Sequence, residues 1–411
     1  MDSVVLLHLL HSIASRFDWR LSALHVHHGI SPNADGWADF CMRFCERLGV
    51  PLHVENVDVA PLRDEHGVEA AARKLRLACF TKLPCDFVAL AHHADDQVET
   101  VLLQLLRGAG IKGAAAMPLL KPVAAQTHAT VRPLLDITHD ELHEYARQQG
   151  LDWVEDESNA DDSYPRNFLR HRLLPLLEQR FPSYRNTLTR SAQHFAEAAG
   201  LLDELAQQDG AYALQDGALQ VEVLRSLSSH RAKNLLRYFL YTQHAPMPQA
   251  AQLDDMLHQL CEAREDAGVC VEFGAWQVRR FQDRCYASPT LGEFDRSFVS
   301  VWRGEAELAW PPLGRHLRFT QARGRGLSCA KLQQAPVTLR LRRGGESLRP
   351  HPDASTRSLK NLLQEHHIPP WQRERWPLLY CGDDLVCVAG VDIHSEYQAH
   401  EDEESVLVSL K

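Results

Sequence analysis

Two histidines and two carboxylates lie side by side in the segment Ala91-His92-His93-Ala94-Asp95-Asp96. A short apolar run, residues 86–91, leads into them and is typical of a strand covered on both faces. A helical pattern over residues 95–107 follows, so one aspartate can cap this helix while the other faces outward. Adjacent carboxylates also suit a magnesium ion bound to phosphates. The segment therefore predicts a phosphate-handling site, with a purely structural role as the alternative.

A second histidine-rich segment, His25-Val26-His27-His28-Gly29, ends another predicted strand, residues 21–27. A structural loop would usually carry Gly, Asn and Ser at such a place. In a parallel sheet, ligands bind beyond the carboxyl ends of the strands. We therefore expect both segments at the same edge of one sheet.

Strands alternate with helices over the first 150 residues, which predicts βαβ units and a doubly wound, mainly parallel α/β sheet. The expected helices are 3–17, 34–49, 69–83, 95–107 and 139–149, and the expected strands are 21–27, 51–57, 86–91 and 131–135. Asp2 and Ser3 stand where the N-cap of the first helix, or an anion bound to it, would lie. Thr138 is the expected N-cap of the helix at 139–149.

The pattern changes twice beyond residue 150. A long helix is predicted over 183–208, followed by a small, mostly helical domain with two short strands and by a β-rich α+β segment. We predict three domains, at residues 1–208, 209–292 and 293–411.

The last domain concentrates positive charge. Residues 315–375 carry 13 Lys or Arg against four Asp or Glu, although the whole chain has a net charge of −10. Because local charge decides whether a face neutralises phosphates, this segment is a candidate nucleic-acid surface. A solvated basic face is the alternative.

The composition excludes several classes of protein. The 411 residues are 45% hydrophobic and 24% charged, which is typical of a globular domain protein. No apolar run reaches the ~20 residues that span a bilayer, and the first residues lack the features of a secretory signal. The ten cysteines are scattered without a C-x-x-C pair, which favours reduced packing residues over zinc or disulfide sites. We expect a cytoplasmic protein with no membrane partner.

A polar stretch, residues 155–164, runs into Arg166, Asn167 and Arg170. One interpretation is an internal ion-pair network between the carboxylates and the arginines. The other is a hinge that presents Arg166 and Arg170 to a phosphate backbone.

With these motifs in place, the first domain resembles the PP-loop ATP pyrophosphatases, through His92-x-x-Asp95-Asp96-x-x-Glu99-Thr100. Nearly the whole chain resembles those members of the superfamily that modify an isoleucine tRNA with lysine. The stretches that carry this narrower resemblance are Asp156-Glu157-Ser158-Asn159, Arg166-Asn167-x-x-Arg170, Arg342-Arg343-Gly344-Gly345-Glu346, and residues 359–365 and 368–380.

The resemblance implies a HUP-like PP-loop fold that uses ATP and Mg²⁺. Its substrates would be free L-lysine and a tRNA(Ile) with a CAU anticodon. ATP would adenylate O2 of the wobble cytidine, and the lysine ε-amine would then attack C2 and displace AMP. The product would read AUA in place of AUG. The oligomeric state, monomer or homodimer, stays open.

The resemblance also assigns residues. His92, Asp95 and Asp96 would line the reaction centre, and His93 could exchange roles with His92. Asp96 would polarise or deprotonate the lysine amine, with Mg²⁺ binding by Asp95 and Asp96 as the competing role. The residues implied for ATP are Asp2, Ser3, His25, His27 and Arg73, and those implied for tRNA are Arg166, Asn167, Arg170, Arg342 and Arg343.

The chain departs from the family at its start. The PP-loop reads Ser-Gly-Gly-x-Asp-Ser after a buried strand, whereas this sequence begins Met1-Asp2-Ser3. A start codon assigned too late explains the difference, and a true truncation is the alternative. Because the glycines let backbone amides approach pyrophosphate, we expect the chain as written to bind ATP poorly and to fold its first domain badly. A non-catalytic tRNA-binding remnant and another PP-loop tRNA-modifying enzyme are the competing functions.

Overall fold

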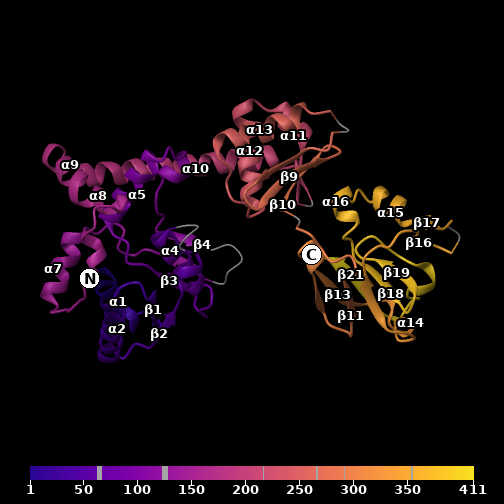
Figure 1. Ribbon diagram of the computed structural model, residues 1–411, viewed down its shortest axis with the longest axis horizontal. Coiled ribbons are helices and arrows are strands. Elements are labelled where there is room, and N and C mark those ends of the chain that lie inside the picture. The colour runs from indigo at the N-terminus through magenta and orange to yellow at the C-terminus, as the bar shows by residue number, and fades with distance from the viewer. Residues whose placement is uncertain (63–66, 123–127, 216, 265–266, 291, 353–354) are drawn as a thin grey trace. The chain divides into compact units, whose positions relative to one another are not determined.

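A computed structural model describes residues 1–62, 67–122, 128–215, 217–264, 267–290, 292–352 and 355–411. The chain divides into two compact units, Met1–Asp209 and Gly210–Lys411. Figure 1 shows the first unit in indigo to magenta and the second in orange to yellow. The bounds of the three predicted domains stay predictions. Among the described helices, none has the length and apolar character required to cross a membrane.

The strands of the first unit form two separate sheets. Strand β1 (Ala23–His27) pairs in parallel with β2 (Leu52–Asn56). Strand β3 (Phe87–Ala89) pairs in parallel with β5 (Ala129–Val131), and β4 (Leu120–Pro122) is antiparallel to β5. The parallel pairs confirm the predicted α/β class. In the described part of the chain, however, no ladder joins the two sheets into the single sheet that we expected.

Strand β3 is shorter and more exposed than its apolar sequence predicted. It lies at the edge of its sheet, and Phe87 is 61% exposed. The prediction of a strand covered on both faces is therefore wrong. The expected strand at 131–135 instead ends at Val131, since Pro133 cannot donate to a ladder.

Helices surround these strands. They are α1 (Asp2–Ala14), α2 (Ala34–Leu48), α4 (Val68–Phe80), α5 (Ala94–Leu106), α6 (Ile111–Ala114), α7 (His139–Gln148), α8 (Pro165–Phe168), α9 (Leu174–Arg180) and α10 (Tyr184–Gly210). Residues Glu157–Ala160 form a 3₁₀ turn and Leu169–Leu173 a π-helical turn. Helix α1 packs Val5 and Leu6 against Leu142 and Ala146 of α7.

The two helix caps predicted in the first unit have different outcomes. Thr138 is the N-cap of α7, as predicted, and its side chain accepts from the N–H of Glu141. The Thr138 N–H donates in return to Glu141 Oε2 at 2.8 Å, a second bond that was not predicted. At α1 the N-cap is Met1, without a side-chain hydrogen bond, so the capping role expected for Asp2 or Ser3 is wrong. The helix begins one residue earlier than expected, which leaves the Asp2 carboxylate available to α5.

The second unit begins with a helical layer on an antiparallel sheet. Helices α11 (Val221–Ser226), α12 (Ser229–Thr242) and α13 (Ala250–Glu262) pack against the strand order β6-β7-β10-β9-β8 (Figure 1). The strands are β6 (Leu214–Gln215), β7 (Ala218–Gln220), β8 (Cys270–Phe273), β9 (Trp276–Phe281) and β10 (Arg284–Pro289). This part therefore has three strands more than the sequence predicted.

The rest of the second unit is β-rich, as predicted. One sheet has the order β11-β15-β18-β19-β20, a second β12-β13-β21-β14, and β16 pairs with β17. The strands are β11 (Val299–Trp302), β12 (Glu307–Trp310), β13 (Arg315–Arg323), β14 (Leu327–Ser328), β15 (Val337–Arg340), β16 (Ser347–Leu348), β17 (Arg357–Ser358), β18 (Leu378–Cys381), β19 (Asp384–Val388), β20 (Asp392–Ile393) and β21 (Glu404–Leu410). Short helices are α14 (Cys329–Leu332), α15 (Leu359–Glu365) and α16 (Pro370–Arg373).

Candidate active site at the start of helix α5

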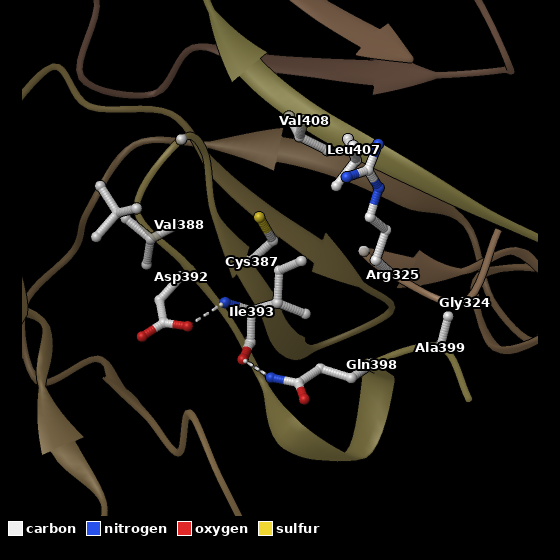
Figure 2. Close-up of a pocket in the computed structure, with 13 residues that line it drawn as sticks. Gly324, Arg325, Cys387, Val388, Asp392, Ile393, Gln398, Ala399, Leu407 and Val408 are labelled. Atoms are coloured by element: carbon white, nitrogen blue, oxygen red, sulfur yellow. Dashed lines mark hydrogen bonds between the residues drawn. The ribbon is translucent and has the colours of Figure 1, made fainter. Parts of the chain in front are cut away.

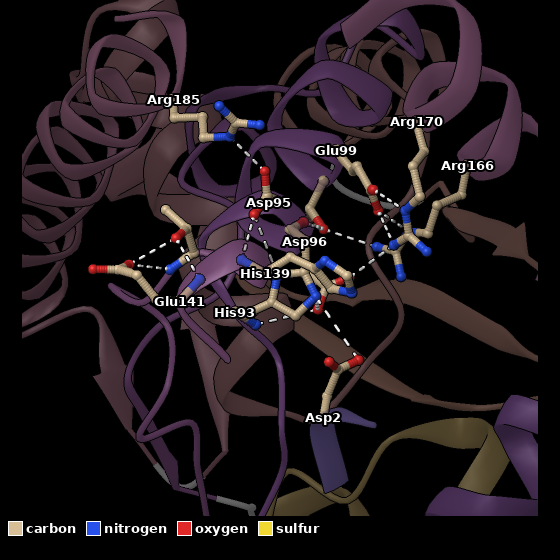
Figure 3. Close-up of polar contacts among 12 residues, drawn as sticks. Asp2, His93, Asp95, Asp96, Glu99, His139, Glu141, Arg166, Arg170 and Arg185 are labelled. Carbon is tan, nitrogen blue, oxygen red and sulfur yellow. Dashed lines mark hydrogen bonds and ion pairs between the residues drawn. The ribbon is translucent and has the colours of Figure 1, made fainter. Parts of the chain in front are cut away.

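His93 lies at the centre of the carboxylate cluster that the sequence singled out. It is the N-cap of α5 and is 2% exposed. Its Nε2 lies 3.4 Å from Asp96 Oδ2 and 3.9 Å from Asp2 Oδ2, and its Nδ1 lies 3.7 Å from Asp95 Oδ2. Figure 3 shows Asp2 approaching His93 from α1. The structure thus brings together the N-termini of α1 and α5, two helix ends that favour anions.

Asp95 is engaged on both of its oxygens. Its Oδ1 accepts from Arg185 Nε at 2.5 Å, and its Oδ2 accepts from the N–H of His139 at 2.9 Å. Burial acts in the opposite direction, but these bonds hold the pKa of Asp95 below its usual range. Asp95 therefore joins the first turns of α5, α7 and α10 as a charged carboxylate.

Asp96 is as enclosed as Asp95, with 13% of each side chain exposed, but it makes longer contacts. Its Oδ2 accepts from the N–H of His93 at 3.2 Å, and its Oδ1 lies 3.4 Å from Arg170 Nη2. Both contacts are longer than those of Asp95. Of the two adjacent aspartates, Asp96 is the one that can take a new partner with the smaller rearrangement.

Glu99 is a buried anchor for two arginines. It lies one turn after Asp96 and is fully buried. Arg170 donates to both of its oxygens, at 2.7 and 3.1 Å, and Arg166 Nε lies 3.3 Å from Oε2 (Figure 3). Burial raises the pKa of Glu99, and the bonds to Arg170 oppose that rise. Arg170 belongs to the π-helical turn, a feature that is frequent at functional sites.

His92 lies in a cationic neighbourhood. Burial, followed by the charges of Arg132, Arg166 and Arg73, lowers the pKa of His92 to about 4, against the opposing effect of Asp96. The imidazole is therefore neutral at physiological pH. Its Nδ1 is buried and has no hydrogen-bond partner within the described structure.

The remaining predicted nucleotide residues have different partners. His27 Nε2 lies 3.0 Å from Asp35 Oδ1, and His25 Nδ1 lies 3.6 Å from the Sγ of Cys41, so both contact α2. Ser3 is exposed on α1, and Arg73 is exposed on α4. The structure thus brings Asp2 to the α5 cluster and directs His25 and His27 towards α2.

The predicted tRNA residues fall into two groups. Arg166 and Arg170 pair with Glu99 of α5, whereas the first interpretation gave them the carboxylates of residues 155–164 as partners. Within that loop, Asp162 pairs with Arg172 instead. Asn167 is buried, and its Nδ2 donates to the carbonyls of Ser158 and Asp161, both at 2.9 Å. Asn167 therefore shapes the polar loop, and only its Oδ1 remains for another role.

Arg342 and Arg343 lie in a turn of the second unit. Glu346 accepts from the N–H groups of Arg343 and Gly344 and so closes the turn on itself. Gly344 and Gly345 have φ values of 104° and 88°, a conformation that glycine adopts readily. The turn leaves Arg343 exposed and Arg342 half-buried.

A cavity of about 430 Å³ in the second unit carries none of the predicted catalytic residues (Figure 2). Its polar groups bond within the chain: Asp392 Oδ1 accepts from the N–H of Ile393 at 2.9 Å, and Gln398 Nε2 donates to the Ile393 carbonyl at 3.2 Å. Burial raises the pKa of the Cys387 thiol to about 12, so it is not a nucleophile. The candidate catalytic side chains therefore lie in the α5 cluster and not in this cavity.

From the sequence, His93 was only an alternative to His92, and no role was predicted for Glu99, Arg132 or Arg185. Glu99 had a readable signal, because a residue three positions after Asp96 lies on the same face of a helix. Arg132 lay inside the predicted strand 131–135 and directly follows the observed strand β5. Arg185 carried no signal, since it lies 90 positions from its partner Asp95.

The cluster also has polar atoms that a nucleotide with its metal could satisfy. Buried polar atoms without a partner in the described residues include Asp2 Oδ1, His92 Nδ1 and Arg132 Nε. These atoms and the two helix N-termini fit a nucleotide phosphate with its metal. Among the described residues, no group of three or more His, Cys, Asp or Glu could hold a metal ion by itself. A metal here would therefore need the nucleotide phosphate as a further ligand.

Comparisons with known proteins cover the whole chain. Residues 1–177 match the family described as PP-loop domain, residues 219–286 the TilS substrate binding domain, and residues 337–410 the TilS substrate C-terminal domain. The tRNA(Ile)-lysidine synthase of Nitrosomonas europaea is 43% identical over 100% of this chain and 89% of its own length. The enzyme of the same name from Coxiella burnetii is 37% identical over 98% of this chain and 89% of its own length.

Proposed function

Because the chain belongs to the tRNA(Ile)-lysidine synthase family, we propose that it is an ATP-dependent ligase that forms lysidine on tRNA(Ile). The substrates would be free L-lysine and the wobble cytidine of a CAU anticodon, in the cytoplasm. The full-length relatives favour this activity over a non-catalytic remnant or another PP-loop tRNA-modifying enzyme.

The observation that carries the proposal is the meeting of α1 and α5 around His93. Asp2 and Asp96 approach the same imidazole, and the dipoles of the two helix N-termini favour phosphate. Such an arrangement can bind ATP and stabilise the pyrophosphate that leaves during adenylation.

The reaction needs two displacements. In the first, O2 of the cytidine attacks the α-phosphorus of ATP and pyrophosphate leaves. In the second, the lysine ε-amine attacks C2, the C2–O2 bond breaks, and AMP leaves with O2. Adenylation is required because a pyrimidine carbonyl oxygen is a poor leaving group. The amine must lose a proton to become a nucleophile, so a carboxylate or a histidine is required near C2.

We assign the proton-accepting role to Asp96. Both oxygens of Asp95 already accept short hydrogen bonds, whereas those of Asp96 have longer contacts. The competing role, magnesium binding, would for the same reason fall to Asp96 in place of Asp95, with Asp2 as the second carboxylate. When bound, Mg²⁺ would neutralise phosphate charge. Neutral His92 would donate or accept a hydrogen bond at the nucleotide or the base.

Arg166 and Arg170 would act at the entrance of this site. Glu99 holds both guanidinium groups beside Asp96, and the side chains remain 31% and 37% exposed. They can therefore reach a phosphate without leaving Glu99. The basic segment 315–375, with Arg342 and Arg343, would hold another part of the tRNA.

The test uses the purified 411-residue chain with ATP, lysine and a tRNA(Ile) transcript that has a CAU anticodon. Nucleoside mass spectrometry should find the wobble cytidine converted to a product heavier by one lysine minus one water. AMP in place of ATP, or uridine at the wobble position, should give none. Unmodified cytidine in the complete reaction would overturn the proposal. The expected weak binding of ATP stays a prediction, which the ATP dependence of the same reaction measures.

A further inference from the structure

Arg132 and His92 follow neighbouring parallel strands. Strands β3 and β5 pair with Ala89 opposite Val131, and the N–H of Leu90 donates to the Val131 carbonyl at 2.9 Å. Arg132 is the first residue after β5, and His92 comes three residues after β3. Both residues therefore lie at the carboxyl edge of this sheet, where α/β proteins bind their ligands.

The guanidinium group of Arg132 is buried and only partly satisfied. The residue is 8% exposed, and its Nη1 donates to the Pro118 carbonyl at 2.8 Å. Its Nε is buried and has no hydrogen-bond partner within the described structure. A buried charged donor left unpaired is costly, so the atom calls for an acceptor that a ligand would supply.

The charges around Arg132 are of its own sign. Burial, and then the nearby Arg73, lowers the pKa of Arg132. Arg132 and Arg73 in turn contribute to the lowered pKa of His92. The buried Arg132 and the exposed Arg73 thus place two positive charges near the neutral His92, an arrangement that attracts an anion.

We propose that Arg132 binds a phosphoryl group of the adenine nucleotide, together with Arg73 and His92. This inference rests on the proposed function, since that function brings ATP to this edge and leaves AMP and pyrophosphate as products. A charge-assisted bond from Nε to a phosphate oxygen satisfies the unpaired donor. The phosphate also places a negative charge beside Arg132, Arg73 and His92.

The experiment compares three variants of the full chain by equilibrium binding of ATP, AMP and pyrophosphate. Arg132→Gln removes the charge, and Arg132→Lys restores it without the fork of donors. Arg280→Gln is the matched control, because Arg280 is also buried with an unpartnered Nε but donates its terminal nitrogens to carbonyl groups of the second unit. Thermal unfolding establishes that each variant is folded.

Arg132→Gln should weaken ATP binding roughly tenfold or more, Arg132→Lys should weaken it less, and Arg280→Gln should leave it unchanged. Weaker AMP binding would place Arg132 at the α-phosphate, and weaker pyrophosphate binding would place it at the β- or γ-phosphate. A folded Arg132→Gln with unchanged affinity for all three nucleotide probes overturns the inference, even if its tRNA affinity falls. Failure of the unchanged chain to bind ATP, AMP or pyrophosphate also overturns the inference.

The inference and the proposed function can fail separately. If the unchanged chain forms lysidine and Arg132→Gln binds nucleotide normally, only the inference fails. If the unchanged chain binds ATP but forms no lysidine, and Arg132→Gln binds ATP more weakly, only the proposed function fails.

Discussion

Arg185 Nε donates to Asp95 Oδ1 at 2.5 Å and joins the first turn of α10 to the first turn of α5. The same guanidinium donates from NH1 to Glu178 at 2.6 Å. Tyr184 and Leu188 of α10 pack with Val98 and Leu102 of α5, so an apolar contact accompanies the ion pair. The long helix that leads out of the first unit is thus fixed to the residue beside Asp96.

The first prediction concerns this link. Arg185→Met should reduce the stability of the first unit by about 1.5–3 kcal/mol, since it leaves the largely buried Asp95 with only the His139 N–H. Lysidine formation should slow as α5 loses its anchor. Thermal unfolding and the nucleoside assay measure the two effects. Arg190→Met, at an exposed position of the same helix, is the control. Equal melting of the two variants would contradict the anchoring role.

The second prediction concerns the buried carboxylate. Glu99→Gln removes the charge that holds Arg166 and Arg170. The expected loss of stability is about 2–3 kcal/mol, because both arginines are about a third exposed and water partly screens them. Glu178→Gln, at an exposed ion pair, should cost less than about 1 kcal/mol. Chemical denaturation of both variants measures the difference, and a cost for Glu99→Gln no greater than that for Glu178→Gln would refute the account.

The third prediction concerns pH. NMR of the histidine side chains should show His92 titrating at about 4 in the free protein and at a higher pH with ATP bound, because phosphate favours the imidazolium ion. The unfolded chain takes up this proton near pH 6.5, before the folded chain does. His92 therefore contributes stability above pH 6.5, and that contribution declines as the pH falls towards 4. A midpoint near 6.5 without ATP would show that the imidazole is not desolvated.

The fourth prediction concerns the polar loop. Asn167→Ala removes the two bonds to the Ser158 and Asp161 carbonyls, so limited proteolysis should cut faster within residues 155–164. The stability cost should be about 1–3 kcal/mol, since two carbonyls lose their partner. Asn159→Ala, at an exposed position of the same loop, should leave the cleavage rate unchanged. Identical cleavage of both variants would show that Asn167 does not hold the loop.

Features encoded by nearby residues could be predicted from the sequence, whereas long-range partners could not. The N-cap at Thr138 was predicted, and its partner Glu141 lies three positions further along the chain. The α/β class followed from alternating strands and helices. Strands β6 and β7 of the second unit were missed because two or three residues carry too little periodicity.

The candidate site shows the same division. The His92–Asp96 segment was identified from its composition and its place after a strand. The different environments of Asp95 and Asp96 depend on Arg185 and Arg170, which lie 90 and 74 positions away. Their neighbours in space are set by the packing of α10 and of the π-helical turn, which no local pattern encodes.

Lysidine formation by the unchanged chain and by Asp96→Asn, measured side by side by nucleoside mass spectrometry, tests the central claim most directly. The unchanged chain should convert the wobble cytidine in an ATP-dependent reaction. Asp96→Asn keeps an oxygen for the His93 N–H but cannot take the lysine proton, so its rate should fall about 10²–10⁴-fold while its thermal midpoint stays close to that of the unchanged chain. No conversion by the unchanged chain, or a rate for Asp96→Asn within a few-fold of it, would contradict the account.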